Sequence, residues 1–317
     1  MLRTHQIPCP VCQTQNSRFL FQAPDRLHGV EGSFPYVKCL SCGLTFMNPQ
    51  VVPEDIGALY PTDYAPHATK GTQVASAFTS VPARKPSPLA GSIDDFFTNE
   101  KLGTEVTRAR REDSTLLDVG CGNGRFLQKM RERYGYQVSG VDFSPLAVQA
   151  AKTNYGIDVF QGFLEDARYP DASFDVVTAW WYLEHVPEPL PALREIARIL
   201  KPGGYLVFGV PNTHSVVAAL FGNLWYHLDS PRHLSLFAPR SVKRLVADAG
   251  LETREISFDK TPWGLLGSLA YAFGGDGMAP ARWRKKAWLR QSLLPVTALL
   301  GLSGYGDTLV VRARKPS

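Results

Sequence analysis

The chain has 317 residues and a formal net charge of +5 at pH 7, and 44% of its residues are hydrophobic and 20% charged. This length predicts about two domains, and the composition is that of an ordinary globular protein, which excludes the disordered and fibrous classes. No uninterrupted apolar run approaches the roughly 18 residues of a membrane span, and the N-terminal segment lacks an apolar leader. We therefore expect a cytoplasmic protein.

Four of the five cysteines form two C-x-x-C pairs near the N-terminus, Cys9 with Cys12 and Cys39 with Cys42. Two such pairs in turn-forming settings can close one tetrahedral site of four thiolates around zinc. Two disulfides would need an oxidising compartment, and a redox C-x-x-C would not need a second pair. We therefore predict a small zinc-ribbon domain over residues 1–60, with these four cysteines as metal ligands.

The predicted ribbon carries four basic and four acidic residues, so it lacks the basic surface of a nucleic-acid-binding module. We do not expect nucleic acid as a partner, and we interpret the ribbon as structural or as a lid on a substrate site. Residues 61–92 shift to Pro, Ala, Ser, Thr and Gly, which predicts a linker to a second domain over residues 93–317. We expect the two domains to have separate cores.

Residues 115–125 read T-L-L-D-V-G-C-G-N-G-R, a short apolar strand, a glycine loop and the start of a helix. Gly120, Gly122 and Gly124 allow a ligand to lie directly against the backbone. The third glycine falls one residue earlier than in the dinucleotide fingerprint, which disfavours NAD. Asp142 ends the next strand about 20 residues further on, the offset at which a carboxylate accepts hydrogen bonds from ribose. A nucleoside ligand is implied.

Helical and strand patterns alternate after the glycine loop. Strands are expected at residues 137–142, around Val159, at 174–179, at 205–210, and around Glu255 and Val310. This alternation predicts an α/β fold with a doubly wound parallel sheet and helices on both faces. Segments 213–240 and 262–303 interrupt the alternation and are interpreted as insertions.

Four motifs in this order, D-V-G-C-G-N-G, G-V-D-F-S, F-D-V-V-T-A-W-W-Y-L-E-H-V and L-K-P-G-G-Y-L, resemble those of class I S-adenosylmethionine-dependent methyltransferases. The subgroup that they resemble includes the ubiquinone-pathway enzymes. The resemblance implies a Rossmann-like seven-stranded sheet and S-adenosylmethionine as the cofactor. The glycines would face the methionine moiety, Asp142 the ribose, and Phe143 the adenine, although Phe143 is equally a candidate for the core. The expected cofactor-binding residues are Asp118, Gly120, Gly122, Gly124, Asp142, Phe143, Phe163 and Trp180.

Methyl transfer from a sulfonium is an in-line displacement that needs positioning and removal of the acceptor proton. His185 is the histidine at the family's usual place, and orienting the start of a helix is its alternative role. His233 lies in the aromatic and polar segment 225–237, where it would line a pocket, unless that loop serves only an Asp229–Arg232 ion pair. Related quinone O-methyltransferases have an acidic residue where this chain has Trp181, so we do not expect a metal-assisted catechol site.

Residues 282–290 read R-W-R-K-K-A-W-L-R and lie between two apolar stretches within 263–302. Tryptophans beside clustered cations suit an anionic membrane surface, which predicts peripheral association with the inner membrane face. The alternative is a cap over the substrate cleft with a solvated basic face.

These features predict a methyltransferase for a small-molecule, glycan or lipid-linked acceptor, with O-methyl transfer favoured over C-methyl transfer. A ribosomal-RNA methyltransferase with a zinc module is one alternative, and a cofactor-binding protein without catalytic activity is another.

Overall fold

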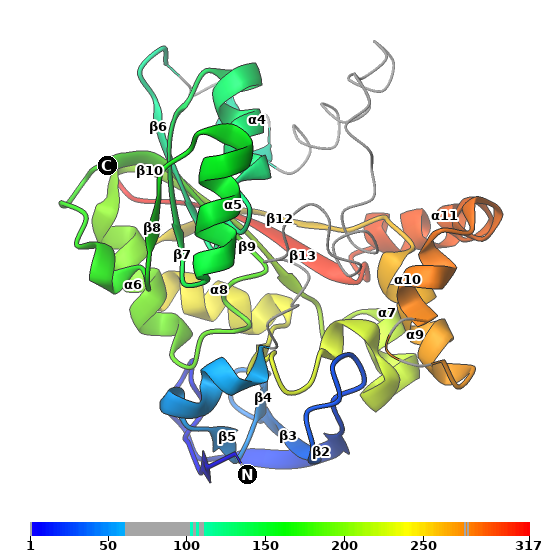
Figure 1. Ribbon diagram of the computed structural model, residues 1–317. Coiled ribbons are helices and arrows are strands. Elements are labelled where there is room, and N and C mark those ends of the chain that lie inside the picture. The colour runs from blue at the N-terminus through cyan, green and yellow to red at the C-terminus, as the bar shows by residue number, and fades with distance from the viewer. Residues whose placement is uncertain (1, 61–101, 104–105, 108–110, 276, 278) are drawn as a thin grey trace.

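A computed structural model describes residues 2–60, 102–103, 106–107, 111–275, 277 and 279–317 of the chain. Figure 1 shows a central sheet flanked by helices, a smaller group of strands from the N-terminal segment, and a cluster of helices at one side. The predicted linker at residues 61–92 lies outside the described residues.

The central sheet has the predicted number of seven strands, and their order is β12-β13-β10-β9-β6-β7-β8. Only β13 runs antiparallel to its neighbours, since it lies between β10 and β12 and pairs with both in that sense. The chain moves outward from β6 to β8 and then returns to β9, so the order reverses between β6 and β9, where open α/β sheets bind ligands. The strands are β6 (Thr115–Val119), β7 (Gln137–Asp142), β8 (Val159–Gln161), β9 (Phe174–Trp180), β10 (Leu200–Pro211), β12 (Glu252–Phe258) and β13 (Thr308–Arg314).

Helices cover both faces of this sheet (Figure 1). Helix α5 begins where Ser144 accepts a hydrogen bond from the amide of Ala147, and it ends at Gly156, which has a φ of 62°. These are the expected start and stop signals of a helix, a polar N-cap and a left-handed glycine. The helices packed on the sheet are α4 (Arg125–Tyr134), α5 (Pro145–Tyr155), α6 (Pro189–Ile199) and α8 (Pro239–Asp248).

The N-terminal segment folds into short strands and one 3₁₀ helix. Its elements are β1 (Thr4–His5), β2 (Ser17–Ala23), β3 (Phe34–Cys39), β4 (Thr45–Met47), β5 (Gln50–Val51) and η1 (Pro53–Leu59). Strands β2, β3 and β4 form an antiparallel sheet, and its fourth strand is β11 (Ser235–Leu236), which comes from the first insertion. We call residues 2–60 the N-terminal module.

The N-terminal module shares its hydrophobic core with the larger domain. Cys9, Leu44 and Phe46 lie in one buried cluster with Leu245 of α8 and Leu183, which follows β9. The expectation of two separate cores is therefore wrong. A segment of this length is too short to bury a large hydrophobic core by itself. The apolar side chains of the module therefore pack against α8 and the first insertion.

The two insertions add helices beyond the sheet. The first contains α7 (Val216–Phe221) and the 3₁₀ helices η4 (Gly222–Leu224) and η5 (Tyr226–Leu228), and the second contains α9 (Trp263–Ala272), α10 (Ala279–Arg284) and α11 (Ala287–Leu302). In the part of the chain that the structure describes, no helix has both the length and the apolar character needed to cross a membrane.

Candidate functional site

The glycine loop joins β6 to α4 in the predicted conformation. Gly120, Gly122 and Gly124 have φ values of 73°, 54° and 76°, a left-handed region that other residues rarely adopt. A Cβ atom at Gly124 would lie 2.8 Å from the Cβ of Ala151, so this glycine also lets α4 approach α5 closely. The loop therefore exposes main-chain atoms to a ligand at the carboxyl edge of the sheet.

Asp142 is the last residue of β7, and its carboxylate holds the glycine loop through hydrogen bonds. Its Oδ2 accepts a hydrogen bond of 2.8 Å from the amide of Gly122, and its Oδ1 accepts one of 2.9 Å from the amide of Ser144. The side chain is buried but lines the cavity described below. A carboxylate fixed in this way can still accept hydrogen bonds from ribose hydroxyls through its remaining lone pairs.

Two of the predicted cofactor contacts, Asp118 near the end of β6 and Gly124 in the loop, are not part of the cavity wall described below. Asp118 accepts a hydrogen bond of 2.6 Å from Thr178 Oγ1 and is not part of the cavity wall. Burial raises the pKa of Asp118 to about 7. In this structure Asp118 therefore supports the loop from below, and its direct contact with a cofactor stays a prediction.

A large cavity of about 1820 Å³ lies between the central sheet, the N-terminal module and the two insertions. Its wall contains eight of the predicted site residues, and these come from five different segments of the chain. They are Gly120, Gly122, Asp142, Phe143, Phe163, Trp180, His185 and His233.

Two exposed aromatic rings flank the cofactor side of the cavity. Phe143 and Phe163 are nearly parallel, with an interplanar angle of 10° and a centroid distance of 6.4 Å. Their exposed fractions are 42% and 63%, which is unusual for phenylalanine and leaves their faces accessible to a flat ligand. Phe143 is therefore not part of the core, and its contact with the adenine stays a prediction.

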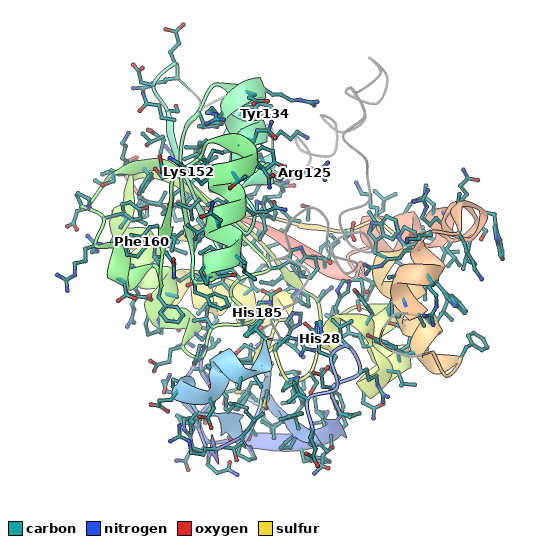
Figure 2. All side chains as sticks on the ribbon, viewed as in Figure 1. His28, Arg125, Tyr134, Lys152, Phe160 and His185 are labelled. Atoms are coloured by element: carbon teal, nitrogen blue, oxygen red, sulfur yellow. The ribbon has the colours of Figure 1, made fainter. Side chains whose placement is uncertain are left out.

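His185 and His233 are neighbours in the cavity wall. Their ring centroids are 4.6 Å apart. His185 lies in the middle of the molecule, between the sheet and the N-terminal module (Figure 2). Nδ1 of His185 lies 2.9 Å from the hydroxyl of Tyr60 and 3.2 Å from the carbonyl oxygen of Arg232. Because that carbonyl can only accept, a proton on Nδ1 satisfies the contact and leaves Nε2 as the basic nitrogen.

Both imidazoles are held neutral. Burial, with the neighbouring His233 as a second cause, lowers the pKa of His185 to about 3. Burial also lowers the pKa of His233, whose Nδ1 lies 2.8 Å from the carbonyl oxygen of His227. Each ring therefore carries an unprotonated nitrogen at neutral pH.

The loop that carries His233 is fixed by a buried charge network. Arg232 has no exposed surface, and its guanidinium forms two hydrogen bonds of 2.8 Å to Asp25 of the N-terminal module. It also donates to Asp229, at 2.7 Å. The predicted Asp229–Arg232 ion pair thus exists, and it coexists with the placement of Asp229 and His233 in the cavity wall. The two roles weighed from the sequence are not exclusive.

Comparisons with known proteins identify the family. A family model described as "Methyltransferase domain" matches residues 96–256. The chain is 34% identical over 164 residues to the ubiquinone biosynthesis O-methyltransferase of Thiobacillus denitrificans, and these residues are 48% of this chain and 70% of that protein. The chain is a class I S-adenosylmethionine-dependent methyltransferase.

A second relative agrees with this family, and a solved structure agrees with the fold. The ubiquinone biosynthesis O-methyltransferase of Nitrosospira multiformis is 30% identical over 171 residues, 49% of this methyltransferase and 70% of its relative. A solved structure from Galdieria sulphuraria, assigned as a sarcosine dimethylglycine methyltransferase, matches with a TM-score of 0.50 and 18% identity. The match covers 72% of this chain and 86% of the Galdieria sulphuraria chain. This last likeness concerns the fold alone.

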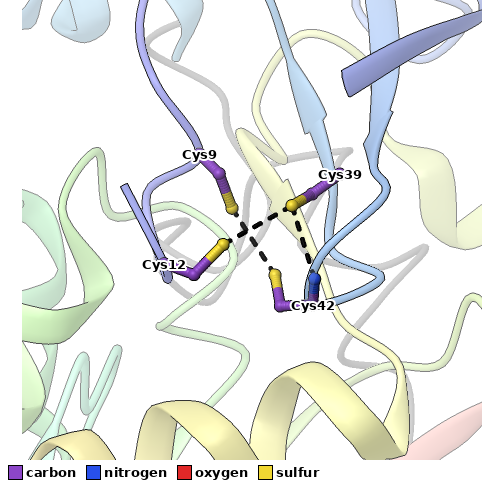
Figure 3. A group of neighbouring side chains, drawn as sticks. All are labelled: Cys9, Cys12, Cys39 and Cys42. Atoms are coloured by element: carbon purple, nitrogen blue, oxygen red, sulfur yellow. Dashed lines mark hydrogen bonds between the residues drawn. The ribbon is translucent and has the colours of Figure 1, made fainter. Parts of the chain in front are cut away.

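The four paired cysteines of the methyltransferase converge in the N-terminal module (Figure 3). The Sγ atoms of Cys9 and Cys42 lie 3.5 Å apart, as do those of Cys12 and Cys39. Four sulfurs at about 2.3 Å from a tetrahedral zinc are separated by roughly 3.8 Å, so the arrangement fits the ion. All four cysteines are free thiols, which leaves them available as ligands.

A second group of metal-binding type lies beside the methyltransferase cavity, with His185 and His233 in its wall. Ligand atoms of Glu184, His185 and His233 all lie within 4.8 Å of one another. Glu184 is fully buried, neither of its carboxylate oxygens has a hydrogen-bond partner among the described residues, and burial raises its pKa well above the usual range. His233 thus joins the Glu-His pair from a distant segment, so the absence of an acid at Trp181 does not by itself exclude a metal.

Three residues of the N-terminal module contribute to this site although no sequence pattern predicted them. Tyr60 contacts His185, Asp25 binds Arg232, and Tyr36 donates a hydrogen bond of 3.0 Å to the carbonyl oxygen of His233. None of these residues belongs to a motif. The oppositely charged residues Asp229 and Arg232 were the one sequence feature that pointed to this network. Their sequence predicted an ion pair, but it did not predict that Arg232 is buried against the N-terminal module.

Proposed function

We propose that this methyltransferase transfers a methyl group to a hydroxyl oxygen of a small-molecule, glycan or lipid-linked acceptor, with carbon as the less favoured site. One observation carries the proposal: the glycine loop and two neutral imidazoles line the same cavity. The two curated relatives are named for O-methyl transfer in ubiquinone biosynthesis, which supports oxygen as the acceptor atom.

One group of residues would bind the cofactor, and another would remove the proton of the acceptor hydroxyl. The main chain at Gly120 and Gly122 and the carboxylate of Asp142 would bind S-adenosylmethionine, which supplies an electrophilic methyl group. Nε2 of His185 takes the acceptor proton as the oxygen attacks, and His233 with the Tyr60 hydroxyl keeps the imidazole oriented. The cavity would align the acceptor for in-line attack on the methyl group.

The four-cysteine site would hold one zinc ion as a structural centre. The donor set of four thiolates is closed, with no position for a substrate, as in structural rather than catalytic zinc sites. Zinc would fix the knuckles from which β3 and β4 extend, and so hold Tyr60 and Asp25 against the cavity.

The test is incubation of the purified protein with labelled S-adenosylmethionine and fractions of a small-molecule cell extract. We expect label in a non-protein product, with fragmentation placing the methyl on oxygen. Loss of a general base typically slows a reaction by about 10²–10⁴-fold, so His185→Ala should lose transfer to that extent. His214→Ala is the matched control, since His214 is not part of the described cavity wall. Equal rates for both variants would contradict the role of His185.

A further inference from the structure

The second insertion places three cations in the cavity wall. Arg284 ends α10, Lys285 follows it, and Arg290 lies in the first turn of α11, and all three line the same cavity as the glycine loop. The segment was expected to direct its cations to a membrane or to solvent. Instead, part of its basic face belongs to the site.

Aromatic rings fix the direction of the two guanidinium groups. The Cζ atom of Arg284 lies 4.3 Å from the ring centroid of Tyr226 and 5.6 Å from that of Trp263. The Cζ atom of Arg290 lies 5.6 Å from the centroid of Trp263. Cation–π contacts of this kind hold a guanidinium in place without neutralising its charge.

No described carboxylate forms an ion pair with Arg284, Lys285 or Arg290. Nε of Arg284 is buried and has no hydrogen-bond partner among the described residues. Two carboxylates in the same wall are already engaged, Asp229 with Arg232 and Asp259 with the amide and hydroxyl of Thr261. A buried donor without a partner is costly, and three cations with no ion-pair partner among the described residues add positive charge to this part of the cavity wall.

We propose that this end of the cavity binds a phosphate or diphosphate group of the methyl acceptor. The inference rests on the proposed function, because it names the chemical class of the molecule that enters the same cavity. Three cations exceed what a single carboxylate can neutralise, whereas a phosphoryl group carries close to two negative charges and accepts several hydrogen bonds. The aromatic rings of Tyr226 and Trp263 then pack against the neighbouring part of the acceptor.

Calorimetric titration of the full-length protein with inorganic pyrophosphate tests this directly. We expect binding that weakens as salt is raised, and no binding of acetate at the same ionic strength. Arg284→Gln should weaken pyrophosphate binding about tenfold or more, which is the usual loss for one charge-assisted hydrogen bond. The triple variant with Arg284, Lys285 and Arg290 changed to Gln should abolish it. Arg282→Gln is the matched control, because this exposed neighbour is not in the described cavity wall.

Titration of the same samples with S-adenosylhomocysteine separates this proposal from the proposed function. We expect the triple variant to bind S-adenosylhomocysteine like the wild type, which also shows that it is folded. If wild-type protein binds S-adenosylhomocysteine but not pyrophosphate, or if Arg282→Gln weakens pyrophosphate binding as much as Arg284→Gln, the anion site is refuted while the methyltransferase assignment stands. Binding to phosphatidylglycerol vesicles without binding to pyrophosphate would assign the cations to a membrane surface and would also overturn the proposal.

Discussion

Replacing Arg232 by methionine removes the charge that joins the N-terminal module to the catalytic loop. The guanidinium has no exposed surface and binds Asp25 through two hydrogen bonds of 2.8 Å and Asp229 through one of 2.7 Å. Methionine fills similar space but leaves two buried carboxylates without a counter-ion. Removing one partner of a buried ion pair costs about 3–5 kcal/mol.

The expected effect on thermal unfolding follows from the size of the protein. Unfolding entropy scales with chain length at roughly 2 cal/mol/K per residue, so a loss of 3–5 kcal/mol should lower Tm by about 5–8 °C. Arg244→Met is the matched control, because Arg244 pairs with Asp248 on the exposed surface of α8. Exposed pairs contribute about 0–1 kcal/mol, so its Tm should fall by no more than about 2 °C.

Scanning calorimetry of both variants provides the measurement. In the Arg232→Met background, changing Asp25 and Asp229 to Asn should recover much of the lost stability, because the uncompensated charges are then gone. Equal Tm shifts for Arg232→Met and Arg244→Met, or no recovery in the triple variant, would refute the reasoning that the buried network stabilises the joint between module and domain.

Three further predictions follow from the site. Gly122→Val or Asp142→Ala should abolish S-adenosylhomocysteine binding in calorimetry with an unchanged circular dichroism spectrum, and unchanged affinity in both would reject the site assignment. Elemental analysis should find about one zinc per chain, and Cys39→Ser should lose the zinc and lower the Tm of the whole protein, since the module shares its core with α8. A zinc-free wild type, or an unaltered Tm, would count against this. Asp118 has a folded pKa of about 7, above its unfolded value of about 3.9, so its contribution to stability is lost as pH rises between these values. Asp118→Asn should remove that part of the pH dependence in urea unfolding between pH 4 and pH 8, and parallel curves for both proteins would contradict it.

The features that the sequence predicted correctly are local. Gly120, Gly122 and Gly124 follow a buried strand directly, so their conformation depends on neighbours a few residues away. Four cysteines at C-x-x-C spacing likewise bring two pairs of thiols into neighbouring turns. Helical and strand periodicity predicted the alternating α/β fold, and the family resemblance added the seven-stranded sheet.

The features that escaped prediction join distant segments. Asp25 and Arg232 are 207 residues apart, and Tyr60 and His185 are 125 apart. No periodicity or motif in the sequence predicts such contacts. They form because β11 pairs with β4 and brings the first insertion onto the N-terminal module. The interpretation of Arg284 and Arg290 as surface cations had the same cause, since their aromatic partners Tyr226 and Trp263 lie outside the basic run.

A crystal structure of the zinc-loaded protein with S-adenosylhomocysteine would test the central claim most directly, namely that the module and the sheet form one methyl-transfer cavity. We predict that the ribose hydroxyls bind Asp142 and that the sulfur faces the cavity on the side of His185 and His233. A sulfur directed away from these histidines, or an N-terminal module detached from the cavity, would contradict the account.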